Sequence, residues 1–393
     1  MASALITNSS DLSRLRAEGY EVAVKSGYLV ITNVPYLTAQ RVVARGTLIS
    51  ALKLANSTTT ARPDNHVVQF IGSHPCNLDG SEIQGLGRHG DPKQKLAEGL
   101  VADFSFSNKP EGGYTDFYEK MSRYVQVISA PVIAIDPSAT ARTGKVIESR
   151  TADSPFVYTD TNSSRAQITA ISEKLKGQHI AIVGLGGTGS FVLDLVAKTP
   201  VKEIHLFDED DFYLHNAFRS PGAPTRADLD TIPTKVAYYS AVYSRLHKGI
   251  VPHCENLNES SVARLQGFDF VFLCIDTSPE KKAVVNYLAD HGIPFVDTGL
   301  GVQAADEKLV GIVRATTITR DKRNHIDARI PTVGKGADEY ATNIQIAELN
   351  MLNGVMAVIR WKKLLGFYAD YRHEHHCTYT IETNVLLSEE DRT

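Results

Sequence analysis

The stretch IAIVGLGGTGSFVLDLVAK, residues 180–198, constrains the fold of this chain more than any other segment. An apolar run typical of a buried strand leads into a glycine-rich turn, after which apolar residues recur at helical spacing. Gly184, Gly186 and Gly189 satisfy G-x-G-x-x-G, a pattern in which a tight turn presents the N–H groups of a helix N-terminus to phosphate. The segment therefore predicts a strand, a phosphate-binding turn and a helix.

The sequence after this loop alternates between strand and helix patterns. Short β-branched runs at 203–208, 268–276 and 293–299 are separated by helical segments, a long helical segment covers 343–370, and 378–384 favours a last strand. This alternation is typical of an α/β domain built on a Rossmann-like, doubly wound, mostly parallel sheet. We expect this domain to span residues 165–393, after a polar linker at 151–164.

The N-terminal third shows a different pattern, and 393 residues are more than one domain usually holds. Residues 1–150 mix strand-like and helical runs with dense turn signals, which predicts a smaller α+β domain. Within it we expect a helical patch at 39–55 and a strand at 123–135. No motif in this domain indicates a chemical role.

The bulk properties exclude several classes of function. A net charge of −4 and a pI near 6.4 give no reason to expect a nucleic-acid partner or an anionic membrane surface. No apolar run approaches the roughly 20 residues that a membrane span needs, and the N-terminus lacks the pattern of a secretory signal. Four scattered cysteines suggest no disulfide framework, so a cytoplasmic protein is expected.

Asp208 lies about 20 residues beyond the loop, where a dinucleotide-binding domain carries the acid that binds ribose. An NAD- or FAD-dependent Rossmann oxidoreductase is therefore one interpretation. The stretch that follows, FDEDDFYLHNAFR, does not suit it, because Asp210, Asn216 and Arg219 add a second acid, an amide and a cation.

These features together resemble the adenylation signature of the ThiF/MoeB and ubiquitin-activating-enzyme (E1-like) superfamily. That family pairs GxGGxGS with D-x-D-x-V-x-x-S-N-L-x-R-Q. The matching residues are Gly184, Gly186, Gly187, Gly189 and Ser190, then Asp208, Asp210, Asn216 and Arg219. The departures are Phe212, His215, Ala217 and Ser220, of which Ser220 replaces a glutamine and removes one polar amide.

The resemblance implies roles for further residues. Lys235, on the following helix, would bind phosphates, and Asp276, at the end of the next strand, would hold Mg²⁺. Arg165 stands where the family has an arginine that reaches the partner subunit's nucleotide site. The implied reaction is attack of a carboxylate on the α-phosphate of ATP, and Arg219 and Lys235 would stabilise the charge that develops there.

The implied substrate is the C-terminal carboxylate of a ubiquitin-like or sulfur-carrier protein, and the implied assembly is a homodimer. Residues 347–361 offer an apolar helix for its interface. The segments FSFSNKPEGGYTDFYEKM and GSHPCNLDG of the N-terminal domain resemble a domain that precedes ThiF modules in bacterial ubiquitin-like operons. This resemblance implies that the domain recognises another protein, either the ubiquitin-like protein or a conjugating, E2-like enzyme. A non-enzymatic module that binds a ubiquitin-like protein is the remaining alternative, supported by the changes at His215 and Ser220.

No cysteine lies in residues 319–340, where thioester-forming members of the family carry their nucleophile. An enzyme that stops at the acyl-adenylate fits, and Thr332 is the candidate for an oxyester instead. Cys76, close to His74, is expected to be structural. The HEHHC cluster at 373–377 is spaced too tightly for a closed zinc site, so we expect a solvated turn there.

Overall fold

The computed structural model describes residues 2–56, 58–88, 93–145, 154–166, 168–332 and 344–389. The chain forms two compact units. The first comprises Met1–Thr151 with Tyr158–Thr169, and the second comprises Ala152–Val157 with Ala170–Thr393. The short segment before Tyr158 therefore belongs to the second unit: Val157 N–H donates to the carbonyl of Leu246 at 2.9 Å.

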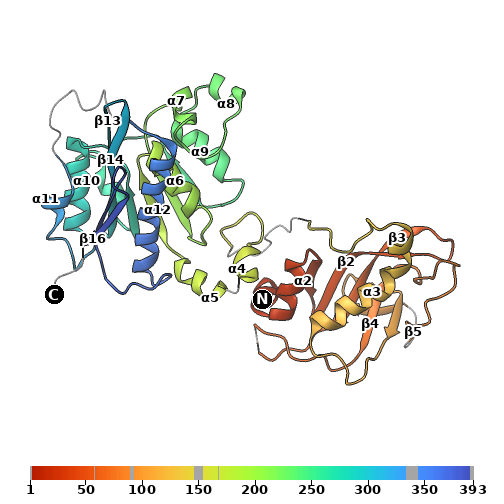
Figure 1. The fold of residues 1–393 in the computed structure, drawn as a ribbon. Helices are drawn as coiled ribbons and strands as arrows, with labels where there is room; N and C mark the ends of the chain where they lie inside the picture. The colour runs from red at the N-terminus through yellow and green to blue at the C-terminus, as the bar shows by residue number, and fades with distance from the viewer. Residues whose placement is uncertain are drawn as a thin grey trace. The chain divides into compact units, whose positions relative to one another are not determined.

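The first unit packs helices against an antiparallel sheet with strand order β1-β2-β3-β4-β8-β5 (Figure 1). A two-stranded ribbon, β6-β7, accompanies this sheet. The elements are α1 (Ala2–Asn8), α2 (Ser10–Ala17), β1 (Glu21–Lys25), β2 (Tyr28–Leu37), β3 (Val43–Ala51), β4 (Val67–Ile71), β5 (Gly87–Arg88), β6 (Gln94–Ala97), β7 (Leu100–Ala102), β8 (Phe104–Ser107), α3 (Phe117–Ile135) and α4 (Asn162–Arg165).

Two elements of this unit are the reverse of the sequence expectation. The helical patch expected at 39–55 contains strand β3, which pairs with β2 and β4. The strand expected at 123–135 is the second part of helix α3, which Asp116 caps by accepting from Glu119 N–H at 2.7 Å. The α3 side that enters the core carries Phe117, Met121, Tyr124, Ile128 and Val132 at helical spacing, and this burial outweighs the strand preference of its β-branched residues.

The second unit is a doubly wound α/β domain. Its eight-stranded sheet has the order β11-β10-β9-β12-β13-β14-β15-β16. The strands β11, β10, β9, β12 and β13 are parallel to one another, and the pairs β13-β14, β14-β15 and β15-β16 are antiparallel. Its strands are β9 (His179–Val183), β10 (Glu203–Phe207), β11 (Ile250–His253), β12 (Phe270–Leu273), β13 (Phe295–Ala305), β14 (Lys308–Ile318), β15 (His376–Thr380) and β16 (Val385–Glu389). Its helices are α5 (Thr169–Ser172), η1 (Glu173–Leu175), α6 (Gly187–Val196), α7 (Leu214–Ala217), α8 (Arg226–Asp230), α9 (Lys235–Tyr243), η2 (Val262–Leu265), α10 (Pro279–Asp290), α11 (Ile326–Arg329) and α12 (Ala347–Leu364).

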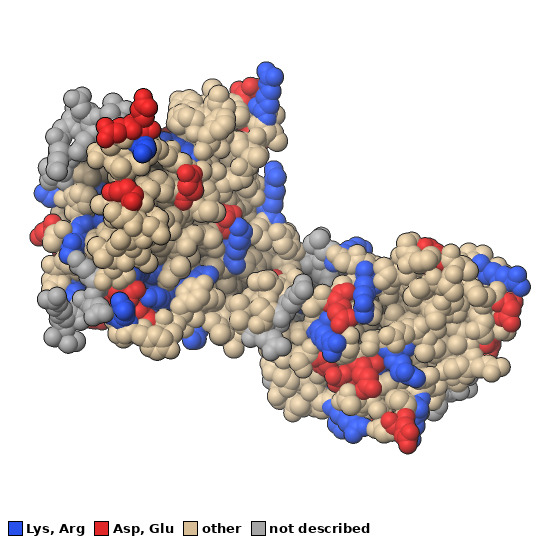
Figure 2. Space-filling model, in the orientation of Figure 1, with Lys and Arg blue, Asp and Glu red and all other residues tan. Residues whose placement is uncertain are grey.

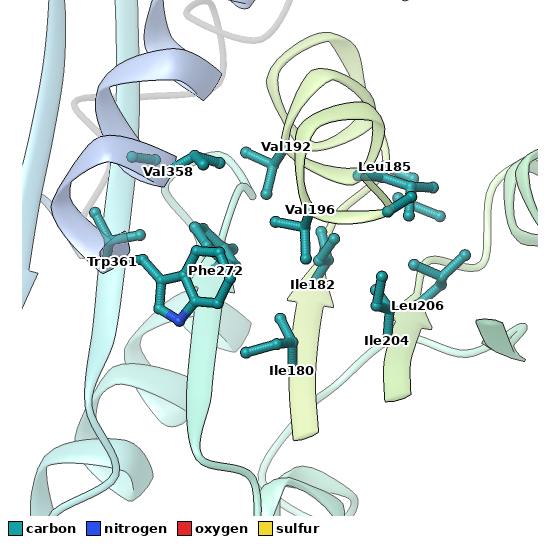
Figure 3. Packing of buried hydrophobic residues seen from close by; sticks show 14 of the residues in the cluster. Ile180, Ile182, Leu185, Val192, Val196, Ile204, Leu206, Phe272, Val358 and Trp361 are labelled. Carbon is teal, nitrogen blue, oxygen red and sulfur yellow. The ribbon is translucent and has the colours of Figure 1, made fainter. Parts of the chain in front are cut away.

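Two apolar layers cover the faces of this sheet. On one face Ile180, Ile182 and Phe272 of the strands meet α6, α9 and α12, including Trp361 with 0% exposure (Figure 3). On the other face alternate residues such as Ala181 and Val183 meet α10 and η2. Burial on both faces explains why these strands are continuously apolar. The predicted fold, a Rossmann-like sheet plus a smaller N-terminal α+β domain, is confirmed.

The strand order changes direction between the parallel strands β9 and β12, because β10 and β11 follow β9 on one side while β12 and β13 lie on the other. Open α/β sheets bind ligands at such a switch point, beyond the carboxyl ends of the strands. Within the described part of the chain no helix is long and apolar enough to cross a membrane. On the face drawn in Figure 2, acidic and basic side chains are interspersed rather than gathered by sign.

Candidate active site

The glycine loop after β9 is held by close backbone contacts at two of its glycines. Gly184 has φ +88°, and a Cβ there would lie 2.5 Å from the carbonyl oxygen of Cys274. A Cβ at Gly189 would lie 2.9 Å from the Gly184 carbonyl carbon and closer still to its oxygen. Gly186 differs, because a Cβ there would meet no atom within 4 Å. The loop is therefore closely packed at Gly184 and Gly189 and open at Gly186, as binding of a phosphate to the backbone requires.

The other two loop residues face the protein. A Cβ at Gly187 would overlap the Asn350 side chain of α12. Ser190 is fully buried and its hydroxyl donates to the Gly187 carbonyl at 2.7 Å. The structure thus uses Gly187 for the packing of α12 on α6, and it uses the Ser190 hydroxyl to close the first turn of α6.

Asp208, which follows β10, fixes the loop from the neighbouring strand. One carboxylate oxygen accepts from Leu185 N–H at 2.6 Å and the other from Asp210 N–H at 2.9 Å. The buried Lys235, at the start of α9, lies 3.3 Å from the Asp208 carboxylate and 2.5 Å from that of Asp210. The structure therefore brings the two predicted acids and the predicted lysine together as one ion-paired group.

The Asn216–Arg219 turn forms the next part of the wall. The Asn216 side-chain oxygen accepts from Tyr213 N–H at 2.9 Å, and the Ser220 hydroxyl donates to the Asn216 carbonyl at 2.6 Å. Arg219 Nε is buried without a hydrogen-bond partner among the described residues. Burial, together with the charges of Arg219 and Lys235, lowers the pKa of His215.

A cavity of about 340 Å³ lies in front of Gly186 at the switch point. Five acidic side chains and two basic ones line it: Asp208, Glu209, Asp210, Asp276 and Glu280, with Arg219 and Lys235. The remaining wall comes from the ends of β12 and β13 and from the segment leading into α12, with Gln345, Asn350 and Asn353. The predicted residues Gly184, Gly186, Gly187, Asp208, Asp210, Arg219, Lys235 and Asp276 therefore share one cavity.

A buried charge cluster supports the loop that carries Asp276. Asp297 of β13, with 0% exposure, lies 2.7 Å from Lys281 and 2.7 Å from Arg314. Lys281 also donates to the Ile275 carbonyl at 3.3 Å, one residue before Asp276. Asp276 itself is exposed to the cavity, and the described residues contain no group of three or more His, Cys, Asp or Glu able to hold a metal alone.

Two predicted residues, Thr332 and Arg165, lie at the margins of the described part of the structure. The half-buried Thr332 directly follows Pro331, whose carbonyl accepts from Thr277, the neighbour of Asp276, at 3.4 Å. The side chain of Arg165, the last residue of α4, lies outside the described part of the structure.

The thiols of Cys76 and Cys274 lack the features of a nucleophile. Burial, with the charges of Glu82 and Asp79, raises the pKa of Cys76, whose thiol donates to the His74 carbonyl at 3.3 Å. Burial raises the pKa of Cys274 to about 12.

The HEHHC segment is partly buried rather than a solvated turn, because His376 and Cys377 lie in β15 and are buried. Glu374 lies 2.7 Å from Arg360 and 2.8 Å from Lys363, both on α12. Burial alone would raise the pKa of Glu374, but the hydrogen bond from Lys363 and the charge of Arg360 lower it to about 2.

Sequence reasoning missed Glu209, Asn256, Gln345, Asn350 and Asn353. Asn256 donates to the Glu209 carboxylate at 3.1 Å on the β10 side of the cavity. Asn350 and Asn353 are each 1% exposed, one helical turn apart in α12. Two asparagines among the apolar residues of this helix were the available signal, since buried polar side chains need partners.

Comparisons with known families divide the chain in two. The model of the ThiF family matches residues 162–377, more than half of the chain. A model described as a domain of unknown function, DUF6791, matches residues 10–161.

Among curated proteins, ubiquitin-like modifier-activating enzyme 5 of Drosophila mojavensis is 24% identical over 151 residues, covering 36% of this chain and 38% of that protein. The tRNA threonylcarbamoyladenosine dehydratase of Escherichia coli K12 is 28% identical over 130 residues, covering 31% and 46%. The matches thus span less than half the length of these relatives. Among solved structures, E. coli MccB with ATP has a TM-score of 0.43 at 16% identity, covering 56% of this chain and 65% of that one.

Proposed function

Because the chain belongs to the ThiF family, we propose that it uses ATP and Mg²⁺ to adenylate the C-terminal carboxylate of a ubiquitin-like or sulfur-carrier protein. The observation that carries the proposal is the single cavity in which Gly186, Arg219 and Asp276 meet. A carboxylate oxygen of the carrier would attack the α-phosphorus, the bond from that phosphorus to the oxygen bridging to the β-phosphate would break, and pyrophosphate would leave. Such a reaction needs positioned charges and no side-chain nucleophile.

The charges of the cavity support a requirement for a divalent cation. Five acids against two bases would repel a polyphosphate, so the nucleotide needs a counter-ion. Asp276 offers one exposed carboxylate there, and Mg²⁺ commonly takes one or two carboxylates plus phosphate oxygens and water. Bound in this way, Mg²⁺ would neutralise phosphate charge.

The chain's own donors account for the rest of the nucleotide site. The first turn of α6 presents N–H groups around the open position at Gly186, and the unpartnered Arg219 Nε suits a phosphate oxygen. Asp208 has both oxygens bound by backbone N–H groups, which fixes it to receive ribose hydroxyls with its remaining lone pairs. Lys235 is already paired with two carboxylates, so its main contribution is to hold Asp208 and Asp210.

The proposed reaction ends at the acyl-adenylate, because the sequence of residues 319–340 contains no cysteine and burial raises the pKa of the Cys274 thiol beside the cavity to about 12. Transfer to Thr332 as an oxyester is the alternative end point. The proposal further includes a homodimer in which Arg165 acts on the partner's site, recognition of the carrier or of an E2-like enzyme by the first unit, and a cytoplasmic location.

Pyrophosphate exchange into ATP tests the adenylation step. Candidate ubiquitin-like proteins from the same genome neighbourhood are added to the wild type, to Asp276→Asn and to Asp290→Asn. Asp290 is an exposed carboxylate at the opposite end of α10 and serves as the matched control. We expect carrier-dependent exchange in the wild type and the control and its loss in Asp276→Asn. The proposal would be contradicted if Asp276→Asn exchanged pyrophosphate as fast as the wild type. It would also be contradicted if the wild type bound MgATP but showed no exchange with any candidate carrier.

Mass spectrometry of the product tests the oxyester separately. A covalent carrier adduct that disappears in Thr332→Ala but survives in Thr319→Ala, at the start of the same loop, would assign the bond to Thr332.

A further inference from the structure

Two amide oxygens on the α12 side of the cavity are buried without a partner among the described residues: Asn353 Oδ1 and Gln345 Oε1. Asn353 is 1% exposed and lines the cavity. A buried acceptor without a partner is unfavourable, so such atoms are uncommon unless a ligand completes them.

A hydrogen-bond relay fixes which atom Asn353 presents. The Arg219 carbonyl can only accept, and it accepts from Asn350 Nδ2 at 3.2 Å. Asn350 therefore turns its oxygen to Thr188, whose hydroxyl donates to it at 3.2 Å. With its proton used, the Thr188 oxygen accepts from Asn353 Nδ2 at 3.5 Å. The atom of Asn353 that is left without a partner among the described residues is consequently its carbonyl oxygen, an acceptor, on a residue that lines the cavity.

An acceptor at this place selects against a phosphate and for a neutral donor. Phosphate oxygens are themselves acceptors, and a divalent cation would choose the nearby Asp276 carboxylate over a neutral amide. The nucleoside is a less suitable donor, because its proposed anchor, Asp208, follows β10, whereas Asn353 belongs to α12, which packs on α6, β13 and β14.

We propose that Asn353 accepts a hydrogen bond from a main-chain N–H of the substrate's tail, so that the site selects an extended polypeptide carboxylate rather than a small acid. This inference rests on the proposed adenylation. Gln345, two residues before the first residue of the same helix, offers a second acceptor along the path of the tail. Asn350 and Thr188 act as positioning residues that keep the Asn353 amide from turning over.

Two analogues of an acyl-adenylate test the proposal without a carrier. One is 5′-O-(glycylglycylsulfamoyl)adenosine, and the other has an ester oxygen in place of the N–H between the two glycyl groups. Calorimetry on the full chain compares their affinities for the wild type, Asn353→Leu and Thr188→Val, with MgATP titrated in parallel. Thr188→Val keeps Asn353 but breaks the relay, so it serves if the leucine variant does not fold.

We expect the wild type to bind the amide analogue about tenfold more tightly than the ester, and both variants to lose most of this difference. In Asn353→Leu the affinity for MgATP should stay unchanged. Equal affinities for both analogues in the wild type would overturn the proposal, as would a loss of MgATP binding in Asn353→Leu, which would place the asparagine on the nucleotide. If neither analogue binds the wild type, the adenylation function fails instead.

Discussion

Alanine at Gly186 and alanine at Gly189 should separate nucleotide binding from stability. A Cβ at Gly186 meets no protein atom within 4 Å, and the backbone there has φ −68°, which alanine adopts. We expect the free energy of unfolding to change by less than about 1 kcal/mol. The methyl group would, however, stand where a phosphate approaches the backbone. Loss of one charge-assisted hydrogen bond corresponds to a MgATP affinity about 10- to 100-fold lower.

Gly189→Ala should act in the opposite order. The new Cβ would overlap the Gly184 carbonyl and lie 3.2 Å from the Cys274 side chain, so α6 must move away from β9. Overpacking of this kind costs about 1–3 kcal/mol. In a unit of this size each kcal/mol lowers the melting temperature by about 2–4 °C.

Scanning calorimetry and MgATP titration on both variants and the wild type check this pair. The reasoning is refuted if Gly186→Ala binds MgATP like the wild type, because phosphate then does not meet the loop at Gly186. It is equally refuted if Gly189→Ala melts with the wild type, because the close approach of helix and strand would then not be a real constraint.

Three further predictions concern buried charges. Burial lowers the pKa of Lys120 to about 8, so keeping this side chain charged destabilises the folded state below that pH. Lys120→Met should therefore raise the free energy of unfolding of the first unit by up to about 3 kcal/mol at pH 7. It should also flatten the rise in stability from about pH 8 to 10.5, which urea unfolding at several pH values would measure. The pKa of Glu374 is depressed to about 2, so the ionised side chain contributes about 3 kcal/mol to the stability of the fold above its ordinary pKa, and this is lost as the pH falls towards 2. Glu374→Gln should remove this acid-dependent loss of stability. Identical dependence of unfolding on acid pH in the variant and the wild type would contradict the prediction. Lys281→Met leaves Asp297 with one cation fewer in a fully buried site and should cost about 3 kcal/mol in denaturant unfolding, whereas an unchanged midpoint would show that Arg314 alone neutralises the carboxylate.

The second unit was predictable because its signals are local. The glycine loop and the acid after each neighbouring strand lie within short stretches, and a parallel sheet brings the carboxyl ends of its strands to one edge. Asp208 and Asp276 were therefore found without knowledge of the packing, and the cavity contains both.

The first unit was less predictable because packing decides its elements. In β3, Gly46 sits where the Phe70 ring of β4 covers the strand, a contact between residues far apart in the chain. Helix α3 is rich in β-branched residues and holds Pro131, yet its apolar side fills the core. Helix and strand propensities cannot assign either segment correctly, because burial against distant residues outweighs these local preferences.

The missed part of the site has the same origin. The role proposed for Asn353 depends on its hydrogen-bond relay with Thr188 and Asn350, and Thr188, in the glycine loop, lies more than 150 residues earlier in the chain. No spacing rule links these positions. The structure supplies the link, because α12 packs on α6.

The two units are interleaved along the chain, and this limits how they could be exchanged between proteins. Residues 154–157 belong with the second unit, where Lys248 N–H donates to the Pro155 carbonyl at 2.6 Å, but Tyr158–Thr169 returns to the first. A single breakpoint in this region would leave one unit with a strip of sequence that belongs to the other. A hybrid made by swapping either unit would therefore need its breakpoint region rebuilt.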